Sequence, residues 1–448
     1  MRKSVFHIVF ISLCLSLCLT LSLGMAFAGP AAAGANEQLA EPPALITEEG
    51  SLNTGYLNDL SSYIRDRFFL RQELISLHHW LSAKVLGTSG DDSVILGQDG
   101  WLYYTDTLAD YTGTDPMTDR ELFAAANNLR LMNEYCAAQG KRFLFMIAPN
   151  KNSLYPEHMP SYGIRAEDSN ARRLLTRLAE LGVPTVDLFT AFSQEDAQLY
   201  FAHDSHWNTR GAALGADLVN AAFGVESDYY GGDFSQAVPH QGDLYTMLYP
   251  AFTDPEQDRL YGGSLSYEFT TSATRPDAIS LRTESSKEGS LLAYRDSFGI
   301  LLFPFLADSY GQAQFSRSTA YDLTKEADFV LVELVERNLR YLIQNLPVMP
   351  APEAAIAPLA ETAGTVTVTA NKRGDWLQVK GQLPSVNPTD SIYVVCNTPC
   401  GNTAYQAFCL GETGFGLNLP PELTPEAVVC VSEDGETLAC YKIEIQSK

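Results

Sequence analysis

The first apolar stretch lies at the start of the chain. After two basic residues, positions 4–23 carry no acidic or basic side chain except His7, and residues 26–28 read Ala-Phe-Ala. A basic start, an apolar core and a small-residue cleavage site predict a signal peptide over residues 1–28. The apolar stretch also approaches the roughly 20 residues of a membrane-spanning helix, so an uncleaved signal anchor stays open. Either alternative predicts an extracytoplasmic protein, secreted or held at the outer face of the membrane by this segment.

Between residues 51 and 345, helical and strand patterns take turns. A capping box of Thr118 and Glu121 opens a predicted helix that Gly140 ends, and the apolar run 143–147 follows directly, as expected for a strand buried on both faces. Further elements are predicted over 56–86 (helix), 94–96 and 101–104 (hairpin), 171–181 and 209–223 (helices), 185–189 (strand), and 291–294 and 329–334 (strands followed by helical segments). The alternation predicts an α/β domain of three layers, with helices covering both faces of a parallel sheet.

Two segments of loop composition flank this domain. Residues 29–50 are rich in Ala, Gly, Pro and Glu without an apolar period, which predicts a flexible tether. Residues 346–364 collect several prolines among alanines, which predicts a linker. Beyond it, residues 365–448 contain short β-rich runs between turn residues, and we expect a small β-sandwich domain there. A chain of 448 residues also exceeds what one core usually organises.

Composition narrows the range of partners. Acidic residues outnumber basic ones by 54 to 30, and the formal net charge is -24. Such a field repels phosphate backbones, which argues against a nucleic-acid partner. Charge of this sign otherwise serves solubility.

The cysteines crowd the C-terminal segment, where five of the eight lie (Cys396, Cys400, Cys409, Cys430 and Cys440). Export permits disulfides there, although five thiols leave one over. A zinc site built on Cys396 and Cys400 is the alternative. Cys136 falls on the apolar face of the helix that Thr118 opens and is expected in the core.

Three predicted loops carry polar side chains suited to chemistry: residues 149–152, 203–208 and 295–299. In α/β sheets reactive groups gather on loops at the carboxyl ends of the strands. A serine hydroxyl needs a base to take its proton, and the base needs a third group that orients it. We predict Ser297 as nucleophile, His206 as base and Asp204 as the orienting acid. Helix amides after Ser297 are expected to stabilise an oxyanion.

Structural and metal-binding interpretations compete with this one. Ser297 alone is also a normal helix cap, and a histidine beside tryptophan is usually a packed residue. His203, Asp204 and His206 are acceptable zinc ligands, with His158 or His240 as a fourth. Adjacent residues such as His203 and Asp204 rarely both reach one ion, so no metal is predicted.

These segments resemble a known family. The stretch FAHDSHWNTRG at 201–211 is similar to the signature of the DHHW proteins and of AlgJ and AlgX, alginate O-acetylation proteins with an SGNH-hydrolase-like domain. Other landmarks come in family order: ILGQDGWLYY (95–104), APNKNSLYPEHMP (148–160), GDLYTML (242–248), YRDSFG (294–299) and VELVERNL (332–339). The chain departs from the family at Ser205, where the DHHW name has His, and at Arg295, where many relatives have a small residue.

The resemblance implies the fold and the chemistry of residues 51–345. It implies an SGNH-hydrolase-like domain with Asp204 and His206 as the acid-base pair and Ser297 as the nucleophile. The implied activity is serine-dependent O-acetyl transfer on a cell-surface or secreted polysaccharide, through an acetyl-enzyme and without a cofactor. The implied partner is a membrane-bound O-acyltransferase that brings acetyl groups from inside. A carbohydrate O-acetylesterase and a noncatalytic polysaccharide-binding or assembly protein stay open as alternatives.

Four further residues are candidates for the oxyanion hole or the substrate cleft. Lys151 and Tyr155 match the family's P-x-K and Y-P positions, and Asn150 stands beside Lys151. Arg295 is a candidate for reshaping the cleft or binding an anionic sugar.

Overall fold

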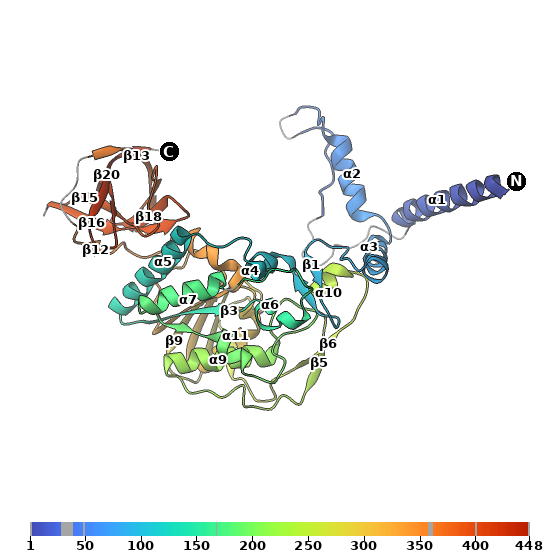
Figure 1. Cartoon of the computed structure of the whole chain (residues 1–448), viewed down its shortest axis with the longest axis horizontal. Helices are drawn as coiled ribbons and strands as arrows, with labels where there is room; N and C mark the ends of the chain where they lie inside the picture. The colour runs from blue at the N-terminus through green and yellow to red at the C-terminus, as the bar shows by residue number, and fades with distance from the viewer. Residues whose placement is uncertain are drawn as a thin grey trace.

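The computed structural model describes residues 2–27, 39–47, 50–166, 168–356, 362–398 and 401–446. Most of the predicted tether, the middle of the predicted linker and Cys400 lie outside these residues. The N-terminal helices and a strand-rich C-terminal region lie at opposite ends of the molecule, with an α/β region between them (Figure 1).

A seven-stranded sheet forms the centre of the α/β region. Its strands lie side by side in the order β4 (Thr185–Val186), β3 (Arg142–Ala148), β11 (Phe329–Val335), β9 (Ser290–Tyr294), β10 (Gln312–Ser316), β8 (Ser280–Ser285) and β7 (Tyr267–Phe269). The first five run parallel, whereas β8 and β7 pair antiparallel. The sheet is therefore mixed, which corrects the expectation of a purely parallel one. β8 alternates exposed and buried residues, because this edge is covered on one face only.

Alternate residues of β3 face two different apolar clusters. Phe143, Phe145 and Ile147 pack in the cluster that includes α5 (Asp119–Ala138), α7 (Asn170–Glu180) and the 3-10 helix η4 (Glu336–Ile343). Their neighbours Leu144 and Met146 pack in the cluster of α8 (Leu188–Ser193), α9 (Thr209–Phe223) and α11 (Gly299–Ser309). Helices thus cover both faces of the sheet, as side chains of period two require.

Local signals placed several helices well. The Thr118 hydroxyl accepts from the Glu121 amide, and the Glu121 carboxylate accepts from the Thr118 amide, so the predicted capping box opens α5. The predicted helix 209–223 is α9. The expected strand 185–189 was wrong beyond Val186, because Asp187 caps α8 and ends it. The expected helix 56–86 is broken at Leu70, whose φ is 60°.

Short elements surround the carboxyl edge of the sheet. A hairpin of β1 and β2 lies where the sequence predicted it, and the others escaped prediction because they are too short to show a period. These elements are β1 (Val94–Leu96), β2 (Leu102–Tyr104), η2 (Thr105–Thr107), α4 (Leu108–Thr112), α6 (Lys151–Leu154), η3 (Pro156–His158), β5 (Ala237–His240), α10 (Asp243–Leu248) and β6 (Glu256–Arg259).

The C-terminal strands form one hydrogen-bonded sheet of nine strands. Their order is β12 (Glu353–Ala354), β16 (Gly401–Gln406), β15 (Ser391–Thr398), β19 (Thr424–Val431), β20 (Thr437–Gln446), β13 (Thr362–Arg373), β14 (Trp376–Gln382), β18 (Gly414–Leu419) and β17 (Phe408–Leu410). Register shifts in β13, β15 and β19 mark bulges, which let one sheet curl. The expected strand-rich region is confirmed, but the two-sheet sandwich is not.

The α/β region and the C-terminal sheet share one apolar core. Leu129 of α5 and Val394 of β15 belong to the same cluster. Leu346, Met349 and Ala351, in the segment predicted as a linker, are buried in it too. Residues 346–351 of that segment are therefore packed into the core that both regions share.

The N-terminal segment is helical. α1 (Arg2–Phe27) contains a stretch of 21 residues, Val5–Met25, that is long and apolar enough to cross a membrane. A signal sequence meets the same criterion. α2 (Tyr56–Arg67), α3 (Arg71–Leu81) and the π-helix η1 (Ser82–Leu86) follow. His79 of α3 bonds the Leu248 carbonyl, which ties this helix to the α/β region.

The thiols of the described C-terminal cysteines are buried and free. The zinc alternative involves Cys400, which lies outside the described residues.

Candidate active site

The serine turn, residues 295–299, joins the end of β9 to the start of α11. The Asp296 carboxylate accepts from the backbone amides of Phe298 (2.9 Å) and Val335 (2.8 Å) and from the side-chain amide of Asn338 (3.0 Å). These bonds tie the turn to the neighbouring end of β11. Ser297 itself is half-buried, and its backbone amide donates no hydrogen bond to the described residues, so that amide is free for an oxyanion.

The histidine loop, residues 194–208, brings the base to this serine. It lies between α8 and α9 and does not leave a strand of the sheet, contrary to expectation. His206 Nε2 lies 2.8 Å from Ser297 Oγ, and His206 Nδ1 lies 2.8 Å from Asp204 Oδ1. The structure therefore brings the three predicted side chains into one hydrogen-bonded chain.

The second oxygen of Asp204 is held by two groups that the sequence did not single out. His240 Nε2, at the end of β5, lies 2.9 Å from Asp204 Oδ2, and the Asp243 amide at the start of α10 donates to the same atom at 3.0 Å. Asp204 is buried and cannot rotate without losing these bonds. In the sequence, the signal available for Asp243 was its place in the landmark GDLYTML. His240 was considered there only as a metal ligand.

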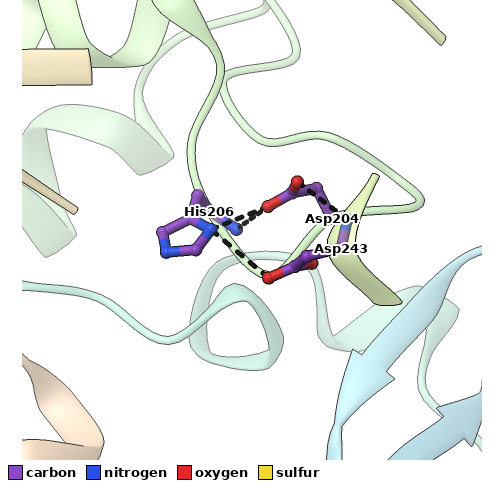
Figure 2. Close-up of side chains that lie close together, drawn as sticks. All are labelled: Asp204, His206 and Asp243. Atoms are coloured by element: carbon purple, nitrogen blue, oxygen red, sulfur yellow. Dashed lines mark hydrogen bonds and ion pairs between the residues drawn. The ribbon is translucent and has the colours of Figure 1, made fainter. Parts of the chain in front are cut away.

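Asp243 also contacts the histidine loop through its carboxylate. It accepts from the Ser205 amide at 2.7 Å and from the Ser205 hydroxyl at 2.6 Å. Its Oδ2 lies 3.5 Å from His206 Nδ1, and Figure 2 shows both carboxylates directed at this imidazole. Ser205, where the DHHW name has His, is thus the bridge between Asp243 and the loop.

At both the acid and the base, burial shifts the pKa in one direction and the neighbouring groups shift it in the other. Burial would raise the pKa of the Asp204 carboxyl, but hydrogen bonds from His206 and His240 hold it well below its usual range. Burial would lower the pKa of the His206 imidazole, but its hydrogen bond and attraction to Asp204 raise the pKa above the ordinary value. Asp204 is therefore a carboxylate that stabilises the imidazolium.

One donor atom each of Asp204, His206 and Asp243 lies within 4.8 Å of the others, so this group could hold a metal ion. Yet the atoms that would face the ion already bond one another and the loop. Both carboxylate oxygens of Asp204 already accept hydrogen bonds, from His206, His240 and backbone amides. A metal would have to displace these bonds, so the arrangement favours proton transfer.

Aromatic side chains back the base. The His206 and Phe298 ring centroids are 4.8 Å apart, and the Trp207 indole donates to the Phe298 carbonyl at 3.0 Å. Phe298 and Trp207 are completely buried. The residue after the nucleophile and the residue after the base therefore pack against each other and set the distance between the two segments.

Lys151 binds backbone carbonyls of the histidine loop. Its ammonium donates to the carbonyls of Phe201 (3.1 Å), Ala202 (2.9 Å) and Asp204 (2.7 Å). Burial lowers the pKa of Lys151 to about 7, against the pull of Asp204 and other carboxylates. The structure thus gives Lys151 a backbone-holding contact, and its contact with a substrate stays a prediction.

The remaining candidates are also engaged with protein groups. The Asn150 amide donates to Glu336 at 3.0 Å, while its side-chain oxygen is buried without a partner among the described residues. The Tyr155 hydroxyl accepts from the Leu199 amide at 2.8 Å. The buried Arg295 guanidinium binds the carbonyls of Pro276 and Ala278, and burial lowers its pKa to about 10. Roles for these residues in substrate binding stay predictions.

Fold and site together define a class of protein. A sheet with helices on both faces carries Ser297 after the carboxyl end of β9, and His206 and Asp204 complete a Ser–His–Asp chain, which is the hydrogen-bond pattern of serine hydrolases and acyltransferases. Residues 94–261 match the family described as "SGNH hydrolase-like domain, acetyltransferase AlgX". The resemblance to the AlgX, AlgJ and DHHW proteins is thereby confirmed for this part of the chain, which includes Asp204 and His206.

Individual relatives agree in name. The chain is 26% identical over 222 residues to "Probable alginate O-acetylase AlgJ" of Pseudomonas syringae pv. tomato, covering 47% of this chain and 56% of that protein. A Pseudomonas fluorescens protein of the same name is 23% identical over 207 residues, covering 44% and 51%. The chain thus spans about half the length of the curated relatives it matches. A solved DHHW family protein from Eubacterium siraeum is 15% identical, with a TM-score of 0.42 and coverage of 57% and 99%.

Proposed function

We propose that this protein is an extracytoplasmic O-acetyltransferase that moves acetyl groups to a polysaccharide through an acetyl ester on Ser297. The observation that carries the proposal is the unbroken chain of 2.8 Å contacts from Ser297 through His206 to Asp204. The family match of residues 94–261 supports acetyl transfer as the chemistry. The relatives named alginate O-acetylase support a polysaccharide as the substrate class.

The first half-reaction loads the enzyme. Ser297 Oγ attacks the carbonyl carbon of an acetyl ester while His206 Nε2 takes the hydroxyl proton. The Ser297 amide donates to the oxyanion of the tetrahedral intermediate. The bond between that carbon and the donor oxygen then breaks, and His206 returns its proton to the leaving oxygen. Acetyl-Ser297 and a free donor hydroxyl result.

The second half-reaction unloads the enzyme. A sugar hydroxyl attacks the acetyl carbon, His206 accepts its proton, and the proton then goes to Ser297 Oγ as the acyl bond breaks. Water in place of the sugar gives acetate, which is the esterase alternative. Which reaction prevails depends on whether the acceptor excludes water from the ester.

Transfer outside the cytoplasm needs an acetyl source, because acetyl donors are made inside. We propose a membrane-bound O-acyltransferase as the partner that supplies it. The apolar segment Val5–Met25 supports export, either as a cleaved signal or as a tether. Mass measurement of the mature protein and its recovery from membrane or soluble fractions distinguish these two forms.

The proposal is tested with a chromogenic acetyl ester and purified protein. Ser297→Ala should abolish ester cleavage, a loss of about 10³-fold or more, because the variant lacks the hydroxyl that His206 activates. Ser290→Ala is the matched control, since Ser290 opens the same strand at its other end and, among the described residues, its hydroxyl bonds only the carboxylate and the backbone amide of Asp328. Equal cleavage by both variants would leave the noncatalytic polysaccharide-binding alternative.

Transferase and esterase are separated by the acceptor. Wild-type protein is given the acetyl ester with and without an oligosaccharide, and the products are analysed by mass spectrometry. Acetylated oligosaccharide that requires Ser297 supports transfer. Acetate alone, in the same amount with and without the acceptor, would show an esterase.

A further inference from the structure

One side of α3 and η1 is apolar and exposed. Leu77, Trp80 and Leu81 follow one another at the spacing of a single helix face, and they are 46%, 43% and 45% exposed. Val85 and Leu86 continue this surface into η1, where they are 73% and 70% exposed. We call these five residues the apolar face. Single exposed apolar side chains are ordinary, but a run of them on one helix indicates an interaction surface.

The other side of α3 is tied to the α/β region, so the helix cannot turn its apolar face inward. His79 Nδ1 lies 2.7 Å from the Leu248 carbonyl oxygen, and the buried Ser76 hydroxyl accepts from the Ala251 amide at 2.9 Å. Both partners lie at or just after the end of α10, whose first residue, Asp243, contacts the histidine loop. α3 is therefore fixed to the part of the molecule that carries the proposed site.

The position of α1 indicates what covers the apolar face. Gly24, near the end of α1, lies directly against the Phe69 ring, which leaves no room for a side chain at residue 24 (Figure 1). Phe69 is two residues before the start of α3. Two basic residues precede the apolar stretch Val5–Met25 in the sequence, so a membrane-spanning α1 has its outer end at Gly24. α3 therefore begins at the depth where the outer edge of the hydrocarbon core lies.

The composition of α3 and η1 suits the interface between lipid and water. Tryptophan is enriched at this interface because its ring is apolar and its N–H is polar. Lys84, exposed between Leu81 and Val85, can extend its ammonium to phosphate head groups while its stem stays on the apolar face. Residues 71–86 contain two basic side chains and one acidic, whereas the whole chain has a net charge of -24. This segment is thus spared the repulsion that the rest of the chain meets at an anionic bilayer.

We propose that α1 is retained as a membrane anchor and that the apolar face of α3 and η1 lies in the outer interface of the lipid bilayer. Interfacial tryptophan and lysine side chains fix the tilt and rotation of membrane-bound elements. The apolar face therefore adds a second contact beside α1 and fixes the orientation of the α/β region at the membrane. Because α3 bonds the end of α10, the side held at the membrane is the side next to the histidine loop.

Tryptophan fluorescence of the full chain in bilayers tests the proposal. The protein is extracted from membranes and reconstituted in vesicles of phosphatidylcholine and phosphatidylglycerol, with or without bromine on the acyl chains. The emission of Trp80 is the difference between the wild type and Trp80→Phe, because α1 has no tryptophan, Trp101 and Trp207 are buried, and Trp376 lies on β14. Bromine should quench this emission at least about twofold, since an interfacial helix buries its apolar face by about 5–10 Å. Anchoring by α1 alone would leave Trp80 in water.

Paired glutamates on the apolar face and on a distant strand supply the variant and its matched control. Leu77→Glu with Leu81→Glu should remove the quenching of Trp80, because carboxylates resist transfer out of water. Leu438→Glu with Ile445→Glu should leave it unchanged, since these residues are 46% and 42% exposed on β20, at the other end of the molecule (Figure 1). Circular dichroism checks that each variant is folded, and vesicle flotation checks that α1 still holds each one in the bilayer.

Each of four results would overturn the proposal. A mature protein that begins after residue 28 would show that α1 is removed. Unquenched Trp80 in the anchored wild type would place the apolar face in water, and quenching that survives the paired glutamates would mean that another surface contacts the lipid. Unquenched Trp80 together with a dimer that Leu77→Glu and Leu81→Glu dissociate would assign the face to a second copy of the chain. None of these measurements involves ester cleavage, so their outcome is independent of the proposed acetyl transfer.

Discussion

At the scale of single residues, the site depends on hydrogen bonds that leave little freedom to its acid. Asp204 is buried and accepts from His206, His240 and two backbone amides. Each bond favours the charged carboxylate and together they outweigh the cost of burying it. The same carboxylate stabilises the protonated form of His206, which is the form that must appear during proton transfer.

The first prediction concerns the pH dependence of ester cleavage. His206 acts as a base only when neutral, and Asp204 raises its pKa, so kcat/KM should rise with pH through an inflection above the ordinary histidine value of about 6.5. Asp204→Asn should lower kcat/KM by roughly 10³-fold and move the inflection to lower pH, because burial of His206 is then opposed only by the weaker attraction of Asp243. A pH–rate profile of both proteins measures this. An inflection at the same pH in the variant would contradict the assignment.

A second prediction concerns Glu333, a completely buried acid on β11 that accepts from the Asp296 amide. Burial, and then repulsion by Asp296, raises the pKa of Glu333 well above its usual range. The folded state therefore keeps a proton that the unfolded chain releases above about pH 4.3, and stability falls as pH rises. The Glu333→Gln variant has no carboxyl proton at this position, so this loss of stability with rising pH disappears.

The free energy of unfolding of Glu333→Gln minus that of the wild type should therefore grow with pH, by up to about 1.4 kcal/mol per unit. Urea unfolding at several pH values from about 5 to 8 measures the difference. A difference that stays constant over this interval would show that Glu333 is ionised in the fold.

At the scale of elements, the site is an assembly of loop segments braced by side chains from α6 and η4. Lys151, the first residue of α6, binds three carbonyls of the histidine loop. Asn338 of η4 binds Asp296 of the serine turn. The two reacting segments are thus held by separate elements that meet at the carboxyl edge of the sheet.

The third prediction removes one brace. Lys151→Met leaves the buried carbonyls of Phe201 and Asp204 without their donor, whereas the Ala202 carbonyl keeps the Leu102 amide, and it should lower the free energy of unfolding by roughly 2–3 kcal/mol. It should also lower kcat, because the carbonyl of Asp204 itself is released. Lys141→Met is the control. Lys141 precedes β3, at the opposite end of that strand from Lys151, and binds the carbonyls of Leu323 and Lys325.

Urea unfolding and ester cleavage are measured for both variants. The control should lose stability and keep its activity, which separates a general loss of stability from displacement of the acid. Full activity in Lys151→Met would show that the histidine loop keeps its place without the ammonium.

At the scale of the whole molecule, the α/β region and the C-terminal sheet are joined by side chains as well as by a common core. Asn128 of α5 donates to the carbonyls of Leu342 and Cys409 and accepts from the Cys409 amide. Arg120, on the same helix, donates to the Asp390 carbonyl. We propose that the two regions are separate domains along the sequence, with a boundary in the segment 346–364. We also propose that they unfold together.

The fourth prediction follows from this joint. Calorimetry of the purified protein should show one unfolding transition for both regions, with equal calorimetric and van't Hoff enthalpies. Asn128→Ala should lower the free energy of unfolding by roughly 2–4 kcal/mol, because buried groups of both regions lose their partners. Two resolved transitions in the wild-type protein would show that the C-terminal sheet folds by itself.

The sequence alone determined the features that depend on neighbours along the chain. The capping box of α5, the extent of α9, and the buried strands β3, β9 and β11 follow from periods and caps of a few residues. The spacing Asp-x-His likewise puts Asp204 and His206 on one turn, so their pairing is a local matter. The edge strand β7 has three residues, which are too few for a period to show.

Only the tertiary structure decided which distant groups complete the site. Ser297 is 91 residues from His206, and His240 is 36 residues from Asp204. No local pattern states that such residues meet, because their approach depends on how the sheet orders its strands and how Trp207 packs on Phe298. The same packing decides that the Arg295 guanidinium meets the backbone carbonyls of Pro276 and Ala278, which no local pattern states.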